Sequence, residues 1–418
     1  MHEGRIIKYF RQKAKLTQQQ LGNGICSDTH ISKIERGMTE YSSEITVLLS
    51  KRLGINIEEE IERYHNIKKL LSRWHDAIIM QRMEDIENIK DELEEENLIK
   101  ISDYQVLYEL LKARYHLLHN NFRIADKIIK DIQKEQRKLP PYESNLLKHN
   151  LGMYYLSNKE MTKAVHILKK INFKDYNNPE YYLTLATSYL GVNSKVMAYY
   201  YADKSLEHFI KSNNYLNVID AEMIMLMTHN GEDQRDFPKV AKQYEKLLQT
   251  CDLCHALGKK ALVLHNFAYE HYCRKDFEAA SRLYQKSMLL KEKKSAAYLS
   301  SLEGYVRSSH EGNYLSTEEL AYLGHEGLSI AREINLSLYM YSFQLLLYLI
   351  HKQKTEYYNF LTTKALPYFK KSGYVTLVKR YEKELFNNYF KYGHKDFALK
   401  LADILINDVE IQEGVGSY

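Results

Sequence analysis

The sequence is poor in the residues that build irregular or cross-linked structure. Its 418 residues include only 5 prolines, 17 glycines and 4 cysteines. Few long loops are therefore expected, and so few cysteines do not form a disulfide framework, which indicates a reducing compartment. Cys251, Cys254 and His255 lie close together, but zinc, redox and haem sites each need further ligands or a flanking pattern that is missing. We expect no metal ion and no other cofactor.

Long hydrophobic runs and common catalytic motifs are also missing. The most apolar stretch, residues 336–350, is interrupted by polar residues and is shorter than the roughly 20 residues that span a bilayer. The first residues, MHEGRIIKYFRQK, have no apolar core of the signal-peptide type, so we expect a cytoplasmic protein without a membrane partner. No phosphate-binding glycine loop or nucleophile elbow occurs, and the 17 histidines show no paired metal-ligand spacing. We expect a protein that is not an enzyme.

The residues that are abundant favour helix. Leu, Ile, Lys, Glu and Tyr dominate, and the 36 tyrosines suit seams between helices. The chain is too long for one ordinary core, so two or more domains or an extended repeat are expected in an all-α fold. The formal net charge is +5, and residues 1–55 carry nine basic and five acidic side chains. This local excess fits contact with phosphates, although a short solvated basic segment would look the same.

The N-terminal segment carries the signals of a helix-turn-helix. Thr17 and Gln20 form a T-x-x-Q capping box that predicts a helix starting at Gln18. After a tight turn, Ser27 or Asp28 can cap the next helix. Two short helices joined in this way, and packed by flanking helices, make the motif. Another four-helix module, or a DNA-binding fold that no longer reads DNA, remains an alternative.

The geometry of that motif assigns roles on double-stranded DNA. The second helix enters the major groove with its N-terminal residues nearest the base edges. The predicted base-reading residues are Ser27, Asp28, Thr29, His30 and Lys33. The predicted phosphate contacts are Gln18, beside a helix N-terminus, and the basic residues Arg11 and Arg36.

Two segments resemble a known family. L-T-Q-Q-Q-L (16–21) and H-I-S-K-I-E-R-G (30–37) resemble the XRE-type helix-turn-helix. The stretch between them is one residue shorter than in most such domains. This shortened turn is similar to that of the RRNPP group, the peptide-sensing regulators of Gram-positive bacteria. The resemblance implies an XRE-type DNA-binding domain at residues 1–58, acting as a homodimer because one domain covers only a half-site.

The rest of the chain is predicted to be a helical array. Residues 59–75 form a helical linker, and residues 76–418 form a right-handed superhelix of tetratricopeptide (TPR) type. The TPR template pairs two helices over about 34 residues, with small residues where they approach. The segments that fit it are L-G-M-Y-Y (151–155) with Ala164, L-A-T-S-Y (185–189) with Ala198, F-A-Y-E-H (267–271) with Ala280, and a weaker match ending at Ala398. A non-repetitive all-helical domain is the alternative.

Candidate ligand residues lie in the first helices of these pairs. A His-Asn dipeptide ends at Asn150 and at Asn266, at the same position of two repeats. An amide can bond both backbone groups of an extended peptide, and the RRNPP resemblance implies that role for both asparagines, with an interhelical hydrogen bond as the alternative. Arg114 and Lys148 could bind a ligand carboxylate. The tyrosines predicted to line the groove, or else to pack in the core, are Tyr182, Tyr189 and Tyr269.

The resemblance implies a cytoplasmic transcription regulator whose array binds a short signalling peptide that modulates DNA binding or oligomerisation. The homodimer could form a higher oligomer with peptide. Two alternatives remain: an array that sequesters a response regulator of a sporulation phosphorelay, as Rap proteins do, or a phage- or plasmid-type repressor that oligomerises through its array. A peptide receptor should show asparagines and tyrosines converging on a groove, whereas a scaffold should show a flat apolar patch.

Overall fold

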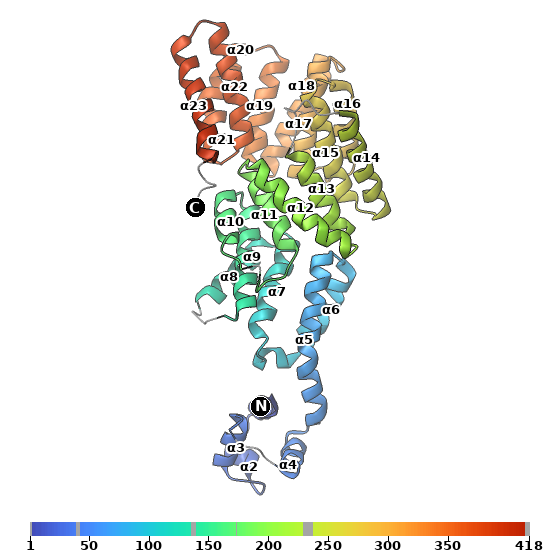
Figure 1. Cartoon of the computed structure of the whole chain (residues 1–418), viewed down its shortest axis with the longest axis vertical. Coiled ribbons are helices and arrows are strands. Elements are labelled where there is room, and N and C mark those ends of the chain that lie inside the picture. Colours follow the sequence, from blue (N-terminus) through green and yellow to red (C-terminus); the bar gives the residue numbers. More distant parts are fainter. Residues whose placement is uncertain (1, 39–41, 135–138, 173, 229–236, 414–418) are drawn as a thin grey trace. The chain divides into compact units, whose positions relative to one another are not determined.

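The computed structural model describes residues 2–38, 42–134, 139–172, 174–228 and 237–413, and the ordered elements of these residues are all helices (Figure 1). The chain forms two compact units, one of residues 1–157 and 169–177 and one of residues 158–168 and 178–418. The prediction of an all-α fold is confirmed. None of the described helices combines the length and the apolar character needed to cross a bilayer.

The first unit contains the N-terminal domain and the first helices of the array. Its elements are α1 (His2–Lys13), α2 (Gln18–Gly22), α3 (Asp28–Glu35), α4 (Ser43–Leu53), α5 (Ile57–Met80), α6 (Met83–Glu95), the 3₁₀ helix η1 (Asn97–Ile101), α7 (Gln105–Leu118), α8 (Phe122–Lys134) and α9 (Pro141–Ser157).

The second unit contains the remaining helices. They are α10 (Met161–Leu168), α11 (Glu180–Gly191), α12 (Lys195–Lys211), α13 (Tyr215–Met227), α14 (Phe237–Leu253), α15 (Leu257–Cys273), α16 (Phe277–Leu289), α17 (Ala296–Gly312), α18 (Thr317–Glu333), α19 (Ser337–Ile350), α20 (Lys354–Phe360), the π-helical turn η2 (Leu361–Ala365), α21 (Leu366–Lys371), α22 (Val375–Lys391) and α23 (Lys395–Glu413).

Helices α1 to α4 form a small domain with its own core. The capping box of Thr17 and Gln20 is present, and Ser27 caps α3. The buried apolar side chains are Ile6, Ile7, Leu21, Ile31, Ile34 and Leu49. Helix α1 approaches the end of α3 so closely that a Cβ on Gly4 would lie 2.1 Å from the carbonyl oxygen of Ile34. Only glycine permits that approach.

Helix α5 connects this domain to the array without a break. It starts at Ile57 and continues to Met80, so the expected linker and the first array helix are one helix. Near its start, the hydroxyl of Tyr64 accepts a hydrogen bond from the backbone N–H of Asp103 at 3.3 Å, and the Asp103 carboxylate pairs with Arg5 of α1. Near its end, the buried indole of Trp74 donates to the carbonyl of Ile86 at 3.1 Å. The two ends of α5 are thus tied to different domains.

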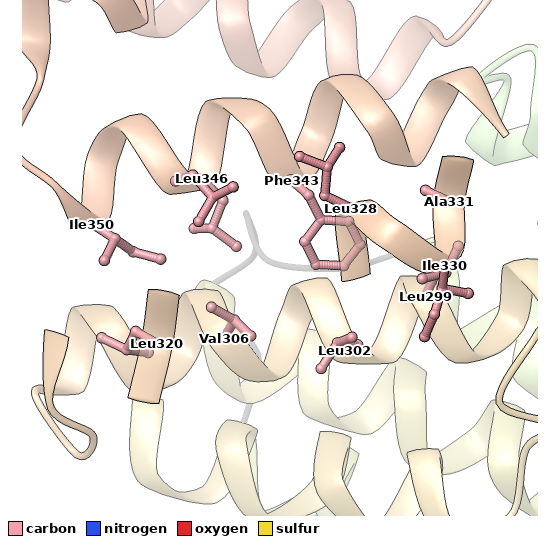
Figure 2. Close-up of a cluster of buried hydrophobic side chains, with 11 residues drawn as sticks. Leu299, Leu302, Val306, Leu320, Leu328, Ile330, Ala331, Phe343, Leu346 and Ile350 are labelled. Carbon is pink, nitrogen blue, oxygen red and sulfur yellow. The ribbon is translucent and has the colours of Figure 1, made fainter. Parts of the chain in front are cut away.

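The second unit is built from successive helix pairs. Consecutive helices such as α11 and α12, α15 and α16, and α16 and α17 pack against each other. The small residues fall where the repeat template predicts, because Ala164, Ala198, Ala280 and Ala398 are all buried in second helices. Figure 2 shows large apolar side chains packed further along, where Phe343 of α19 lies over Leu302 of α17 and Leu346 lies over Val306.

The turns between helices share one backbone conformation. Most connections contain a residue with positive φ, a conformation that ends a helix and turns the chain. In the second unit these residues are Lys159, Asn193, Asn213, His255, Lys275, Asn313, Asn335, Lys352, Gly373 and Gly393. Asparagine and glycine supply most of them, because they adopt this conformation at low cost.

Candidate functional site

The first candidate site is the outer face of α3. Asp28, Thr29 and Lys33 are exposed, whereas Ile31 and Ile34 point into the core. The Ser27 hydroxyl accepts from the backbone N–H of His30 at 3.2 Å, which starts the helix at the point predicted. The structure therefore exposes Ser27, Asp28, Thr29 and Lys33 at the start of this helix, whereas His30 is half-buried and its Nε2 is enclosed.

Lys33 and Arg36, the exposed basic side chains on or beside this face, differ in their interactions with the rest of the domain. The Lys33 side chain makes no ion pair with the described residues of the domain. Arg36, also exposed, donates from Nε to the carbonyl oxygen of Ser32 at 3.1 Å. Both positions are compatible with the predicted contacts to bases and phosphates, which stay predictions.

Arg11 and Gln18 do not face outward as expected. Arg11 donates from Nε and Nη2 to the two carboxylate oxygens of Glu35 at 2.6 and 3.0 Å, and Gln18 donates from Nε2 to the same carboxylate at 2.9 Å. Glu35 is buried, and a buried carboxylate requires several donors. The hydrogen bond to Glu35 raises the pKa of the Arg11 guanidinium. Both side chains are thus engaged within the domain, and their contacts with phosphates stay predictions.

A second cluster lies inside the first unit, around Arg114. His75 and His149 are both buried, and their Nδ1 atoms lie 2.9 Å from the hydroxyls of Tyr142 and Tyr176. Burial, helped by the charge of Arg114, lowers the pKa of His75 to about 4 and that of His149 well below its ordinary value. Both rings are therefore neutral at pH 7, so each Nδ1 can accept the tyrosine O–H. Arg114 itself is only 7% exposed.

The asparagines expected to bind a peptide backbone are already engaged. Asn150 is fully buried and donates from Nδ2 to the carbonyl oxygen of Leu110 at 2.8 Å, the interhelical bond that was the alternative. Its Oδ1 has no hydrogen-bond partner. Asn266 donates to the carbonyl oxygen of Leu262 at 3.1 Å, within its own helix. Any ligand would have to compete for these amides, so the backbone-binding role stays a prediction for both.

The remaining predicted ligand residues are dispersed. Lys148 donates to the side chain of Asn145 at 3.2 Å. Tyr182 and Tyr189 both stack on Tyr201 of the paired helix, with interplanar angles of 15° and 3°. Their rings fill the seam between α11 and α12, which is the packing alternative. Tyr182 also lies under the ammonium of Lys204, 5.6 Å from its ring centre, and Tyr269 lies near a second set of charged groups.

The charged groups near Tyr269 of α15 come from α17 and α22 of the second unit. Arg307 donates from Nε to Glu303, one turn earlier on α17, at 2.8 Å. Arg380 of α22 acts electrostatically on Glu303 and on Tyr269 of α15. Desolvation opposes ionisation of Glu303, but the two guanidiniums hold its pKa below the ordinary value. We call Tyr269, Tyr272, Glu303, Arg307 and Arg380 the arginine cluster.

Sequence reasoning missed most of the arginine cluster. Glu303 and Arg307 are spaced for an ion pair on one helix, which is a common solvated arrangement. Only the fold shows that Arg307 is 5% exposed and that Arg380, seventy-three positions later, approaches the same carboxylate. No local signal in the sequence identifies that meeting.

A basic side chain of a different kind lies near the cluster. Lys291 donates to the buried hydroxyl of Ser301 at 2.7 Å, and the same hydroxyl lies 2.9 Å from Nδ1 of His265. Burial lowers the pKa of Lys291 to about 8, and burial with the charge of Lys291 lowers that of His265 to about 4. Among the described residues, Lys291 has no carboxylate partner.

The cysteines show no sign of a metal centre. Cys251 is buried, and burial raises the pKa of its thiol to about 11, which disfavours the thiolate that binds metals. No group of three or more His, Cys, Asp or Glu side chains suited to a metal ion occurs within the described parts of the chain.

The fold and the candidate sites together define the class of protein: a helix-turn-helix domain followed by an array of packed helix pairs. Residues 7–59 match the family described as Helix-turn-helix. The transcriptional activator NprA of Geobacillus stearothermophilus is 21% identical over 396 residues, which are 90% of this chain and 95% of that protein.

Solved structures share the fold over most of the chain. The quorum sensor NprR from B. thuringiensis, in its apo form, has a TM-score of 0.65 and 19% identity, covering 82% of this chain and 99% of NprR. NprR in complex with its cognate peptide NprX also gives 0.65, with 18% identity and the same coverage. A Rap protein complexed with competence and sporulation factor gives 0.72, with 16% identity, covering 84% of this chain and 99% of that protein. The resemblance to RRNPP-type regulators and the TPR-like fold are confirmed.

Proposed function

We propose that this chain is a cytoplasmic transcription regulator that reads an operator through α3 and binds a short signalling peptide in its helical array. The observation that carries the proposal is the combination of an exposed polar face at the start of α3 with an array whose fold is that of NprR. The proposed role is binding rather than catalysis. Peptide binding would shift the population between states that differ in DNA affinity or in assembly.

Helix α5 could couple peptide binding in the array to DNA binding through α3. Its first half is tied to the DNA-binding domain through Tyr64, Asp103 and Arg5, and its second half is packed into the array around Trp74. A change in the packing around Trp74 would move a continuous helix, and with it the contacts of α1. We infer a homodimer, with a higher oligomer as a peptide-bound form, because one helix-turn-helix covers only a half-site.

Two experiments test the proposal. The first selects double-stranded DNA from a random pool with the full-length chain and compares the wild type with Lys33→Ala. Enrichment of a two-fold symmetric sequence supports DNA reading, and no enrichment contradicts it. The second identifies small peptides that co-purify with the chain from its native cytosol, using mass spectrometry. Recovery of one short peptide in stoichiometric amount supports the receptor role.

A second candidate is a scaffold that sequesters a phosphorelay response regulator. The observation that favours it is the TM-score of 0.72 with a Rap protein. The exposed face of α3 has no use in that role alone. A chain that binds a response regulator but retains no DNA from the random pool would favour the scaffold.

A further inference from the structure

A cavity of about 450 Å³ lies within the second unit, near the C-terminal ends of α17, α19 and α22 and the start of α20. The last three of these helices in chain order are drawn in orange to red in Figure 1. None of the residues predicted to bind the peptide lines this cavity. Its volume is typical of sites for small organic ligands.

Lysine side chains give the cavity an excess of positive charge. The lining lysines, all exposed and without an ion pair among the described residues, are Lys352, Lys354 and Lys391. The lining holds one carboxylate, that of Glu384, and one imidazole, that of His310. The acidic side chains next to lining residues in the sequence, Glu311 and Glu356, are exposed and do not line the cavity. Three ammonium groups therefore face one carboxylate.

These lysines are not needed to complete the ends of the neighbouring helices. Lys352 and Lys391 lie where α19 and α22 end, and a basic side chain at such a place often bonds the last carbonyl oxygens. Here the backbone N–H groups of the following turns already bond those carbonyls, as Tyr392 does to Asn388 at 3.1 Å. The ammonium groups are therefore available to a ligand.

The buried wall of the cavity carries a hydroxyl without a partner. Tyr357 of α20 is 1% exposed and lines the cavity, and its hydroxyl has no hydrogen-bond partner among the described residues. Burial, helped by the charge of Glu384, raises the pKa of Tyr357, so the hydroxyl stays protonated at pH 7. A buried donor without an acceptor is costly, and it is normally satisfied by a ligand or by water.

Aromatic rings and amides form much of the remaining lining. The other ring-bearing residues are Tyr348, Tyr358 and Tyr392. Tyrosine rings offer flat faces on which a heterocyclic base can stack. Asn387 and Asn388 of α22 also line the cavity, and their amides can both donate and accept hydrogen bonds, as the edge of such a base requires.

We propose that this cavity binds a small organic phosphate of the nucleoside monophosphate class, with the phosphate on the lysines and the base against the tyrosines. A phosphate monoester carries a charge of about −1.5 to −2 at pH 7, which fits the excess of ammonium groups. No arginine, the side chain that suits a planar carboxylate, lines the cavity, whereas lysine binds phosphate as a point charge. This ligand site goes beyond the proposed function and shares no residue with the predicted peptide site.

The test measures the binding of small probes to the full-length chain by isothermal titration calorimetry. The probes are the four common ribonucleoside monophosphates, their nucleosides, ribose 5-phosphate and inorganic phosphate. At least one nucleotide should bind about tenfold or more tightly than every fragment, because only the nucleotide uses both the lysines and the tyrosines. No binding of any nucleotide, or equal affinity for one of the fragments, would overturn the proposal.

Substitutions of the lysines show whether this cavity holds the nucleotide. Lys352→Gln, Lys354→Gln and Lys391→Gln should each weaken binding by about tenfold, because each removes one charge-assisted hydrogen bond. Lys383→Gln, at an exposed position of α22 outside the lining, is the matched control and should bind as the wild type does. Undiminished binding by the three lining variants would place the nucleotide elsewhere and overturn the proposal.

Two further variants have effects that loss of folding would not produce. Glu384→Gln removes the one carboxylate of the lining, so the same nucleotide should bind several-fold more tightly. Tyr357→Phe removes an unpartnered hydroxyl, so it should weaken nucleotide binding without lowering the thermal midpoint of the ligand-free chain. Weaker binding by Glu384→Gln, or a lower midpoint for ligand-free Tyr357→Phe, would contradict the proposed site. These outcomes do not depend on whether the array binds a peptide.

Discussion

The guanidinium of Arg11 on α1 and the carboxylate of Glu35 at the end of α3 form a two-pronged ion pair that is almost completely shielded from water. The side chains are 12% and 3% exposed, and the Nε to Oε1 distance is 2.6 Å. Arg11 also donates to the carbonyl of Leu16 at 2.7 Å, in the turn before α2. One arginine thereby fixes three segments of the DNA-binding domain around a single buried carboxylate.

Removing one partner of this pair should destabilise the domain strongly. Glu35→Ala leaves the Arg11 guanidinium buried without an anion and should lower the local free energy of unfolding by about 3–5 kcal/mol. Hydrogen exchange of the amides in α1 to α3, measured in the full-length chain, reports this change. Glu44→Ala, at an exposed site on α4, is the control. The double variant Arg11→Met with Glu35→Leu should recover much of the stability. Unchanged exchange in Glu35→Ala would contradict a stabilising role.

Lys33→Ala should weaken sequence-specific DNA binding without unfolding the domain. Lys33 is exposed on the face of α3 that carries Asp28 and Thr29. If its ammonium contacts guanine, the loss should be about 1–3 kcal/mol on the selected operator and much smaller on random DNA. Fluorescence anisotropy with both duplexes gives the two affinities, and Lys51→Ala on α4 serves as the control. An equal loss on both duplexes would make Lys33 a phosphate contact instead.

The buried histidines should make the first unit sensitive to acid. The pKa of His75 is about 4 when folded and 6.5 as the ordinary value. As pH falls through 6.5 the unfolded chain takes up a proton that the folded chain refuses, so the free energy of unfolding decreases. The slope is about 1.4 kcal/mol per pH unit for each such histidine, down to its folded pKa.

His75→Gln tests this slope directly. The glutamine can still accept the hydrogen bond from Tyr142, but it does not titrate. Chemical unfolding at pH 7 and pH 5 should show a smaller loss of stability for the variant than for the wild type. His149 and His265 also have lowered pKa values, so part of the acid sensitivity should remain. An identical pH profile for the two proteins would show that His75 is not buried in its neutral form.

Lys291 should produce a dependence of the same sign in a higher pH range. Its pKa is about 8 when folded and 10.5 as the ordinary value. Below pH 8 the folded chain carries the full cost of burying the ammonium. Between pH 8 and 10.5 the folded chain has released a proton that the unfolded chain keeps, so stability rises with pH.

Lys291→Met should therefore be more stable than the wild type at pH 7, with a difference that shrinks towards pH 10. The expected difference is about 1–2 kcal/mol, less than the full pKa shift implies, because the side chain is partly solvated. Lys286→Met, at an exposed site on α16, is the control and should show no such convergence. Parallel stability curves for Lys291→Met and wild type would contradict the lowered pKa.

The sequence by itself determined the helix starts in the N-terminal domain and the register of the repeats. The capping box at Thr17, the cap at Ser27 and the buried alanines such as Ala198 depend on residues only a few positions apart, so they can be recognised locally. The exposed α3 face follows from the same periodicity, because burying Ile31 and Ile34 turns Lys33 outward.

Only the tertiary structure decided which polar side chains meet across the fold. Gln18 and Arg11 turn inward because the buried carboxylate of Glu35 needs donors. Asn150 likewise bonds to Leu110, forty positions away in the chain. The direction of a long polar side chain depends on which distant group must be neutralised, and that is settled by how the helices pack rather than by neighbours in the sequence.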